Sequence, residues 1–245
     1  EFTKSFAFRM KTDSEKKLTR NTGFYERTSK LTRNFVDARG FWLPNDYTKH
    51  GVINEYTACR EKAVVIDLSS LRKFEILGPD AEELMNYTLT RNIKKLSVGQ
   101  IVYSAMCYEN GTMFDDGTLL RLSETGFRWV CGDEYAGEWL KEQAKKKKFK
   151  VVVKNSTDQI NNISVQGPNS RKILEKIIFT PPTQPTISEL QWFRFTICRL
   201  EELNGIPFNS SNLQIVNLNH CNSEIVGCVG GVKIIFSKIF LLFGP

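Results

Sequence analysis

The pair Asn110-Gly111 constrains the fold of this chain more than any other feature. It lies between two β-like runs, IVYSAMCY and MFDDGTLLRL. Asn-Gly is a strong short-range signal for a tight turn between antiparallel strands, because both residues tolerate left-handed backbone angles. The two runs are therefore predicted to pair as a hairpin, which places an antiparallel sheet in the middle of the chain.

Further strands and helices alternate around this hairpin. β-Branched and aromatic residues predict strands in KFEILG, FRWVCG and KVVVK, and helical spacing predicts helices in AEELMNYTLT and EYAGEWLKEQAKKKK. Asp80 is predicted to cap the first of these helices, with Glu83 completing a capping box. Another helix is predicted from Asn54 to Val65, running into β-like VVIDLSS. This order indicates an α+β layer with antiparallel pairing.

A second unit is indicated after about Asn155. NISVQGP is predicted to be a short strand, and NSRKILEKII a helix capped by Asn169. The strand, Gly-Pro, helix order of this segment also occurs in ILGPDAEELM, which suggests two related halves. The segment FTPPTQP is the clearest linker, since its prolines interrupt regular structure.

The end of the chain differs in composition from the rest. After Phe208 only Glu224, Lys233 and Lys238 are charged, and no helical or alternating period is evident. Residues 209–245 are therefore expected to be an atypical tail, either a poorly ordered end or the product of a shifted reading frame.

The basic balance of the chain favours a polyanionic partner without identifying one. There are 34 Lys and Arg against 27 Asp and Glu, a formal net charge of +7. Much of the excess lies at 145–150 and in the first 35 residues. Solvated helix ends explain these groups better than a nucleic-acid patch, because the first has only Phe149 for stacking. No uncharged apolar run is long enough to cross a bilayer, and the start of the sequence lacks the apolar core of a secretory signal. We expect a cytoplasmic protein that binds neither nucleic acid nor membrane.

The cysteine pattern argues against metal binding and against a disulfide framework. Six cysteines occur without a C-x-x-C spacing, and His50 and His220 are the only histidines. Four of the cysteines lie in apolar segments, so buried thiols in a reducing compartment are expected.

Asp115-Asp116 is the most pointed candidate for chemistry. Neighbouring strand residues face opposite sides of a sheet, so only one of the two carboxylates can face a cavity. Such a group suits pairing with, or accepting a proton from, a ligand nitrogen. The alternative is a polar strand start or an Asx-turn. No Ser-His-Asp set, phosphate loop or dinucleotide fingerprint is found.

Several motifs in order resemble one family. FVDARGFWLP, NEYTACREKAVVIDLSSL, KFEILGPDAEELM, SAMCYENGTMFDD and SVQGPNSRKIL are similar to the folate-binding region of the glycine-cleavage T-protein (aminomethyltransferase) family. The resemblance runs from about Arg20 to Phe208. The family includes dimethylsulfoniopropionate demethylase and the folate domains of dimethylglycine and sarcosine dehydrogenases.

The resemblance implies two related α+β units of the aminomethyltransferase folate-binding type. Residues 1–55 and 155–208 would form the first, split unit, and residues 56–154 the second. The family continues into a C-terminal β-barrel, whose motifs are absent from this sequence.

The function implied is transfer of an aminomethyl or methyl one-carbon unit to N5 of tetrahydrofolate. The second acid of the family's Asp-Asp pair matches Asp116, which would hold and polarise the folate amine. Leu71 matches an apolar residue that packs on the pterin, and Tyr103 is a cavity neighbour expected from the strand pattern alone. Partners would be folate, a small one-carbon donor and a lipoyl carrier protein.

Two departures from the family pattern bear on the reaction. Ser70-Leu71 replaces the usual His-Met, and Gly132 replaces a folate-contacting Asn. These changes favour a demethylase-like or an undefined branch of the family over glycine cleavage itself. The alternatives are a non-enzymatic folate-binding or assembly protein and an inactive fragment.

Overall fold

The computed structural model describes residues 19–176, 178–179, 182–200, 213–217 and 223–229. These residues divide into two units. Unit 1 comprises those within Glu1–Ser70, Asn161–Leu190 and Thr196–Pro245, and unit 2 comprises Leu71–Ile160 and Gln191–Phe195.

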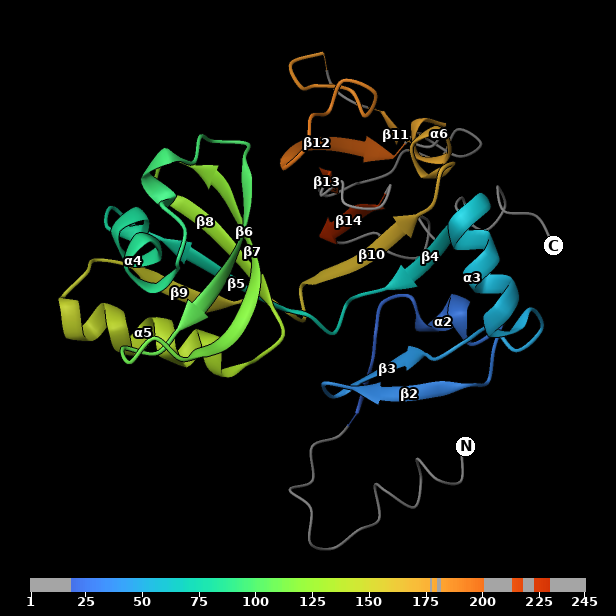
Figure 1. Ribbon diagram of the computed structural model, residues 1–245, viewed down its shortest axis with the longest axis horizontal. Coiled ribbons are helices and arrows are strands. Elements are labelled where there is room, and N and C mark those ends of the chain that lie inside the picture. Colours follow the sequence, from blue (N-terminus) through green and yellow to red (C-terminus); the bar gives the residue numbers. More distant parts are fainter. Residues whose placement is uncertain (1–18, 177, 180–181, 201–212, 218–222, 230–245) are drawn as a thin grey trace, which may run out of the picture. The chain divides into compact units, whose positions relative to one another are not determined.

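Unit 2 is built on a five-stranded sheet, in which every strand pairs antiparallel with its neighbours. The order is β6-β7-β8-β5-β9 (Figure 1). The strands are β5 (Arg72–Leu77), β6 (Ile101–Cys107), β7 (Met113–Ser123), β8 (Gly126–Cys131) and β9 (Val152–Asn155). The predicted hairpin is confirmed, since β6 and β7 pair along their length and the Tyr108 N–H donates to the Thr112 carbonyl at 2.9 Å.

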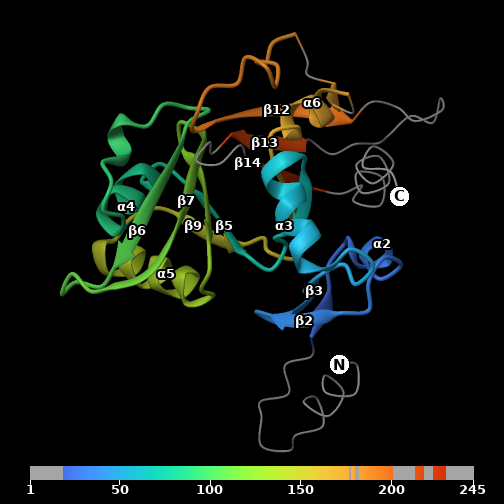
Figure 2. The same ribbon diagram turned by 45° about the vertical axis from the view of Figure 1, so that its right-hand side comes forward.

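Helices cover one face of this sheet. They are α4 (Ala81–Thr88) and α5 (Tyr135–Lys147), with the short 3-10 turn η1 (Ile93–Lys95) beside α4 (Figure 2). Helix α5 ends in lysines, which complement the negative end of its dipole. Lys148 follows in a left-handed conformation and its N–H bonds to the carbonyls of Ala144 and Lys145, which closes the helix.

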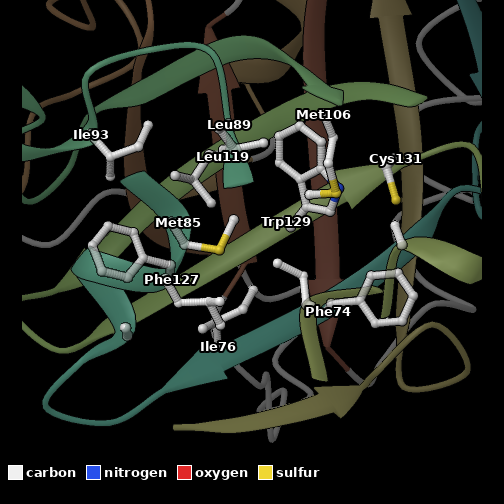
Figure 3. Packing of buried hydrophobic residues seen from close by; sticks show 14 of the residues in the cluster. Phe74, Ile76, Met85, Leu89, Ile93, Met106, Leu119, Phe127, Trp129 and Cys131 are labelled. Atoms are coloured by element: carbon white, nitrogen blue, oxygen red, sulfur yellow. The ribbon is translucent and has the colours of Figure 1, made fainter. Parts of the chain in front are cut away.

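The core of unit 2 lies between these helices and the sheet. It joins alternate residues of the strands to the inward faces of α4 and α5 (Figure 3). Trp129, Phe127, Met106 and Leu119 come from the sheet, and each is fully buried. Since strand side chains alternate, the residues between them face the other side.

A β-bulge interrupts the pairing of β6 with β7. Met106 lies opposite Asp115, but Cys107 lies opposite Met113, so Phe114 is the additional residue. The Phe114 ring packs against Tyr135 and Trp139 of α5, with ring centroids 5.8 Å apart in both pairs. Phe114 and Asp115 therefore both lie on the helix side of the sheet.

Unit 1 contains two sheets. In the three-stranded sheet, β3 (Phe41–Pro44) lies between β1 (Arg20–Asn21) and β2 (Phe35–Ala38). The six-stranded sheet has the order β11-β12-β13-β14-β10-β4. Its strands are β4 (Val64–Asp67), β10 (Ile160–Gln166), β11 (Ile178–Phe179), β12 (Arg194–Leu200), β13 (Leu213–Asn217) and β14 (Ser223–Val229), and the unit's helices are α2 (Tyr25–Thr28), α3 (Gly51–Glu61) and α6 (Ser170–Glu175).

The two Gly-Pro segments have the same local structure. Gly78 follows β5 with φ +139°, and a Cβ there would lie 2.4 Å from the carbonyl oxygen of Lys150, just before the partner strand β9. Gly167 follows β10 with φ +127°, and a Cβ there would lie 2.6 Å from the carbonyl oxygen of Lys62, just before the partner strand β4. Each turn thus packs against the backbone that leads into its partner strand.

The predicted helix caps are wrong. Asp80 and Asn169 precede their helices, but neither side chain makes a capping hydrogen bond. The Asp80 carboxylate instead accepts a hydrogen bond from the Lys150 N–H at 2.7 Å, and Glu83 pairs with Lys94 at 2.6 Å. The close approach of the turn to residue 150 offers Asp80 a backbone donor outside its own helix.

The helix predicted up to Val65 ends earlier. Helix α3 stops at Glu61, and Val64 and Val65 belong to β4, where they pair with Gln166 and Val165. β-Branched residues fit a pleated strand better than a helix end.

The α+β class is confirmed, with helices covering one face of an antiparallel sheet. The predicted domain limits at 55/56 and 154/155 stay a prediction. The expected absence of a C-terminal barrel concerns a region that lies mostly outside the described residues, where only β13 and β14 are given, as an antiparallel pair. Among the described helices, none is both long and apolar enough for a membrane span.

Truncating Leu140 should destabilise unit 2. Its side chain is fully buried in the core between α5 and the sheet, so Leu140→Ala should cost about 2–5 kcal/mol of unfolding free energy. Urea unfolding followed by tryptophan fluorescence measures this. Leu77→Ala is the control, because Leu77 is 46% exposed, and it should cost far less. Equal losses would contradict the core described above.

The two Gly-Pro turns should tolerate no side chain. We expect Gly78→Ala and Gly167→Ala each to cost about 3 kcal/mol or more, because φ is strained and the Cβ meets backbone. Gly99→Ala is the matched control: φ is also positive, at +83°, but nothing lies within 4 Å of its Cβ. Thermal unfolding of the three variants should place Gly99→Ala nearest the parent.

Candidate functional site

Asp116 lies on the face of the sheet that α4 and α5 leave uncovered. Its strand neighbours Asp115, Gly117 and Leu119 follow the helix side, where Leu119 is part of the core. Asp116 therefore faces the other way, as the alternation of a strand requires, and it is exposed. This separation of the two acids is the one that the sequence predicted.

The two carboxylates differ in their bonding. Asp115 Oδ1 accepts a hydrogen bond from the Asp116 N–H at 2.9 Å, and Asp115 Oδ2 accepts one from the Asp133 N–H at 3.0 Å. The Asp116 carboxylate makes no hydrogen bond or ion pair within the described parts of the chain. Of the pair, Asp116 alone keeps its oxygens available to a ligand.

Tyr103 lies beside Asp116 on the same face. Asp116 is opposite Ala105, and Thr118 is opposite Tyr103, so Asp116 and Tyr103 are diagonal neighbours on adjacent strands. Such neighbours are about 7–8 Å apart at Cα, within reach of an aromatic side chain. The Tyr103 ring is 51% exposed, which leaves its face available for stacking.

Leu71 lies at the same end of the sheet. Arg72 pairs with Cys131, and Cys131 pairs with Gly117. Continued by one residue, this register sets Gly132 opposite Asp116, and Leu71 opposite Gly132 on its far side, one strand further from Asp116. Gly132 has no side chain, so the departure from the family's Asn leaves space on the β8 side of Asp116. The structure thus brings Asp116, Tyr103 and Leu71 to one end of the sheet, and their roles stay predictions.

The same face becomes more buried away from Asp116. Leu120 and Ile101, one step further along β7 and β6, are each 3% exposed. Beyond them Arg128 pairs with Glu75 at 2.6 Å, and both side chains are largely buried. Lys73 of β5 lies on this face as well and is fully buried, so Asp116 stands at the exposed end of a face that carries buried charges of both signs.

The segment Gln191–Phe195 covers the edge of β6. The Ile101 N–H donates to the Phe193 carbonyl at 2.9 Å, and the Phe195 N–H donates to the Gly99 carbonyl at 3.1 Å. This pairing protects the edge next to Tyr103 from other strands. No sequence pattern predicts this pairing, because these residues lie far from β6 along the chain.

A surface cavity of about 570 Å³ lies elsewhere in unit 2. Its walls come from the β6–β7 turn and from α5, and they are formed by Tyr108, Glu109, Asn110, Trp139, Glu142, Gln143 and Lys146. It contains none of the predicted site residues. In the described part of the chain, no group of three or more His, Cys, Asp or Glu side chains could hold a metal ion.

Sequence reasoning missed the loop between β8 and α5. Asp133 Oδ1 accepts a hydrogen bond from the Tyr135 N–H at 2.9 Å, and the Cys131 thiol donates to the Asp133 carbonyl at 3.5 Å. Burial, and then the nearby Asp115 carboxylate, raise the pKa of the Cys131 thiol far above its usual value. Cys59, Cys107 and Cys131 are free thiols, and only Cys131 of these is buried.

Comparison with known proteins agrees with the motifs. The family described as the GCVT N-terminal domain matches residues 24–209. The trimethylamine-oxide aldolase of Ruegeria pomeroyi is 52% identical over 206 residues, covering 84% of this chain and 26% of that protein. The aminomethyltransferase of Thermosipho melanesiensis is 32% identical over 188 residues, covering 76% of this chain and 49% of that protein.

A solved structure supports the fold. The crystal structure of the glycine cleavage system aminomethyltransferase T from Bartonella henselae superposes with a TM-score of 0.73 at 22% identity, covering 90% of this chain and 57% of that one. The chain thus spans between about a quarter and a half of the length of these curated relatives. Because the family match covers most of the sequence, the resemblance of the motifs is confirmed, and the chain belongs to the GCVT N-terminal domain family of the aminomethyltransferases.

Proposed function

We propose that this chain carries the folate-binding part of a tetrahydrofolate-dependent one-carbon transferase, which moves an aminomethyl or methyl group to N5 of tetrahydrofolate. The observation that supports the proposal best is the Asp116 carboxylate, exposed and without a partner in the described residues, beside the half-exposed ring of Tyr103. Membership of the aminomethyltransferase family makes folate the first ligand to test.

In this proposal, the residues at this end of the sheet supply the contacts that a pterin ring would need. Asp116 would accept hydrogen bonds from the ring's amine groups, and Tyr103 would stack on its face. Leu71 would add apolar contact from the β8 side, next to the space left by Gly132. Bound tetrahydrofolate supplies the nucleophilic nitrogen, and the protein's contribution is to orient it and to exclude water.

The partners follow from the same proposal. They are folate and a small one-carbon donor, and a lipoyl carrier protein where the donor is an aminomethyl group. We place the protein in the cytoplasm, where folate and reduced thiols occur together.

A second candidate reaction, in which formaldehyde is the one-carbon donor to tetrahydrofolate, has its own support. The relative that is 52% identical is named trimethylamine-oxide aldolase. Chemically, cleavage of one N–methyl bond with transfer of the oxygen to that carbon converts trimethylamine oxide into dimethylamine and formaldehyde. The same Asp116 and Tyr103 would then present tetrahydrofolate to formaldehyde. A rate of methylenetetrahydrofolate formation above the uncatalysed rate, lost in Asp116→Asn, would favour this reaction over group transfer.

Removing the Asp116 charge should weaken folate binding by about tenfold to a hundredfold, to a level that titration still measures. We expect 5-formyltetrahydrofolate to raise the unfolding temperature of the parent and to have little effect on Asp116→Asn, because a charge-assisted hydrogen bond is lost. Glu61→Gln is the control, since it removes an exposed carboxylate from unit 1. Equal stabilisation of parent and Asp116→Asn would reject Asp116 as the ligand group. No shift in any protein would favour the inactive fragment.

Tyr103 should act through its ring. Tyr103→Ala is expected to weaken binding of 5-formyltetrahydrofolate about fivefold to tenfold, because the stacking surface is lost. Tyr103→Phe keeps the ring and should bind within about twofold of the parent. Titration calorimetry on the folded variants measures both constants. If Tyr103→Phe binds the ligand as weakly as Tyr103→Ala, the hydroxyl group of Tyr103 and not its ring makes the contact.

A further inference from the structure

The direction of the Asp116 side chain has to be set by its backbone. The Asp116 carboxylate makes no hydrogen bond or ion pair within the described residues, so no such contact fixes its position. The backbone N–H of Asp116 is held by the neighbouring side chain, through the 2.9 Å hydrogen bond to Asp115 Oδ1. Because this bond crosses one peptide unit, it restrains the peptide plane from which the Asp116 Cα–Cβ bond projects.

Asp115 itself is held at a second point. Its other oxygen, Oδ2, accepts the Asp133 N–H at 3.0 Å. Asp115 is half-buried on the helix side, next to the bulge residue Phe114, whose ring packs on α5. A carboxylate with both oxygens bonded to backbone N–H groups on two different segments has little freedom to rotate.

The loop that Asp115 holds is fixed to the rest of unit 2. Asp133 accepts the first N–H of α5, and the next residue, Glu134, pairs with Arg72 of β5 at 3.3 Å. The Cys131 thiol adds a bond to the Asp133 carbonyl. Asp115 therefore connects the strand that carries Asp116 to a loop anchored on β5 and α5.

The β8–α5 loop begins at Gly132, the residue next to Asp116 on the neighbouring strand side. Gly117 pairs with Cys131, so Gly132 follows beside Asp116. A single side chain thus sets both the plane of the Asp116 peptide and the position of the strand end beside it.

We propose that Asp115 is the positioning residue of the ligand site, holding the Asp116 carboxylate toward the ligand through the Asp116 N–H and the β8–α5 loop. The proposal rests on the proposed function, because it assigns Asp115 a part in ligand binding by Asp116. Asp115 makes no contact with the ligand, since it faces the opposite side of the sheet.

A double-mutant cycle separates positioning from general structure. We compare binding of 5-formyltetrahydrofolate to the full chain as parent, Asp115→Asn, Asp116→Asn and the double variant. Asparagine keeps one acceptor oxygen but presents an amide N–H₂ where the second is needed. Loss of one charge-assisted bond should weaken binding about tenfold in the parent background.

The effect should disappear when Asp116 has been changed. If Asp115 acts through Asp116, then Asp115→Asn in the Asp116→Asn background should change the dissociation constant by less than about twofold. An equal loss in both backgrounds would mean a merely structural role and would overturn the proposal. Parent-like binding by Asp115→Asn would overturn it as well. Should that variant fail to fold, Asp115→Glu takes its place in the cycle.

Cysteine labelling reports the local geometry independently of any ligand. The Asp115 charge raises the pKa of the Cys131 thiol, after the larger effect of burial. Labelling of this buried thiol also requires the β8–α5 loop to open, and Asp115→Asn weakens a bond that holds the loop, so it should speed iodoacetamide labelling of Cys131 relative to Cys59 and Cys107, and Asp116→Asn should not. An unchanged labelling ratio in Asp115→Asn would overturn the geometry on which the proposal depends.

The two readouts distinguish failure of this proposal from failure of the proposed function. If Asp116→Asn binds 5-formyltetrahydrofolate like the parent, the proposed function fails and the positioning role fails with it, even where Cys131 labelling changes as expected. If Asp116→Asn loses binding but Asp115→Asn does not, the proposed function stands and only the positioning role is rejected.

Discussion

The phase of strand β7 is the constraint on which the candidate site depends. Side chains alternate along a strand, so a shift of one residue would exchange the faces of every side chain on it. The bulge at Phe114 sets this phase, because Met106 meets Asp115 and Cys107 meets Met113. Without the additional residue, the pairing of the hairpin turn would put Asp116 on the helix side and Asp115 on the open side.

The bulge is in turn held by packing against α5. Phe114 is in ring contact with Tyr135 and Trp139, which lie one helical turn apart on the helix. Aromatic pairs of this kind contribute about 0.5–1.5 kcal/mol beyond their burial. Tyr108 of the hairpin turn joins the same cluster at 4.7 Å from Phe114. The packing of Phe114 on one face of the sheet therefore also determines that Asp116 lies on the opposite face.

Much of unit 2 could be predicted because its signals are local. The Asn-Gly turn, the alternating strands and the lysine-rich helix end each depend on neighbours within a few residues, and all were confirmed. The cap predicted at Asp80 was wrong because the carboxylate accepts a hydrogen bond from the N–H of Lys150, 70 residues away in the sequence. The bulge was not foreseen, since nothing in MFDDG shows which residue the partner strand leaves unpaired. The edge pairing of residues 191–195 was missed for the same reason.

The candidate site was predicted from two sources that differ in kind. Alternation established that only one of two adjacent acids could face a ligand, but it did not say which, and the family resemblance selected Asp116. The structure adds a physical reason for that choice, because Asp115 uses both oxygens on backbone N–H groups while Asp116 uses neither. A fold optimised for stability alone would gain little from an unpaired carboxylate beside a half-exposed tyrosine. In the proposal made here the two acids have different tasks: Asp115, with both oxygens bonded to backbone N–H groups, would be the rigid one, and Asp116, with free oxygens, would bind the ligand.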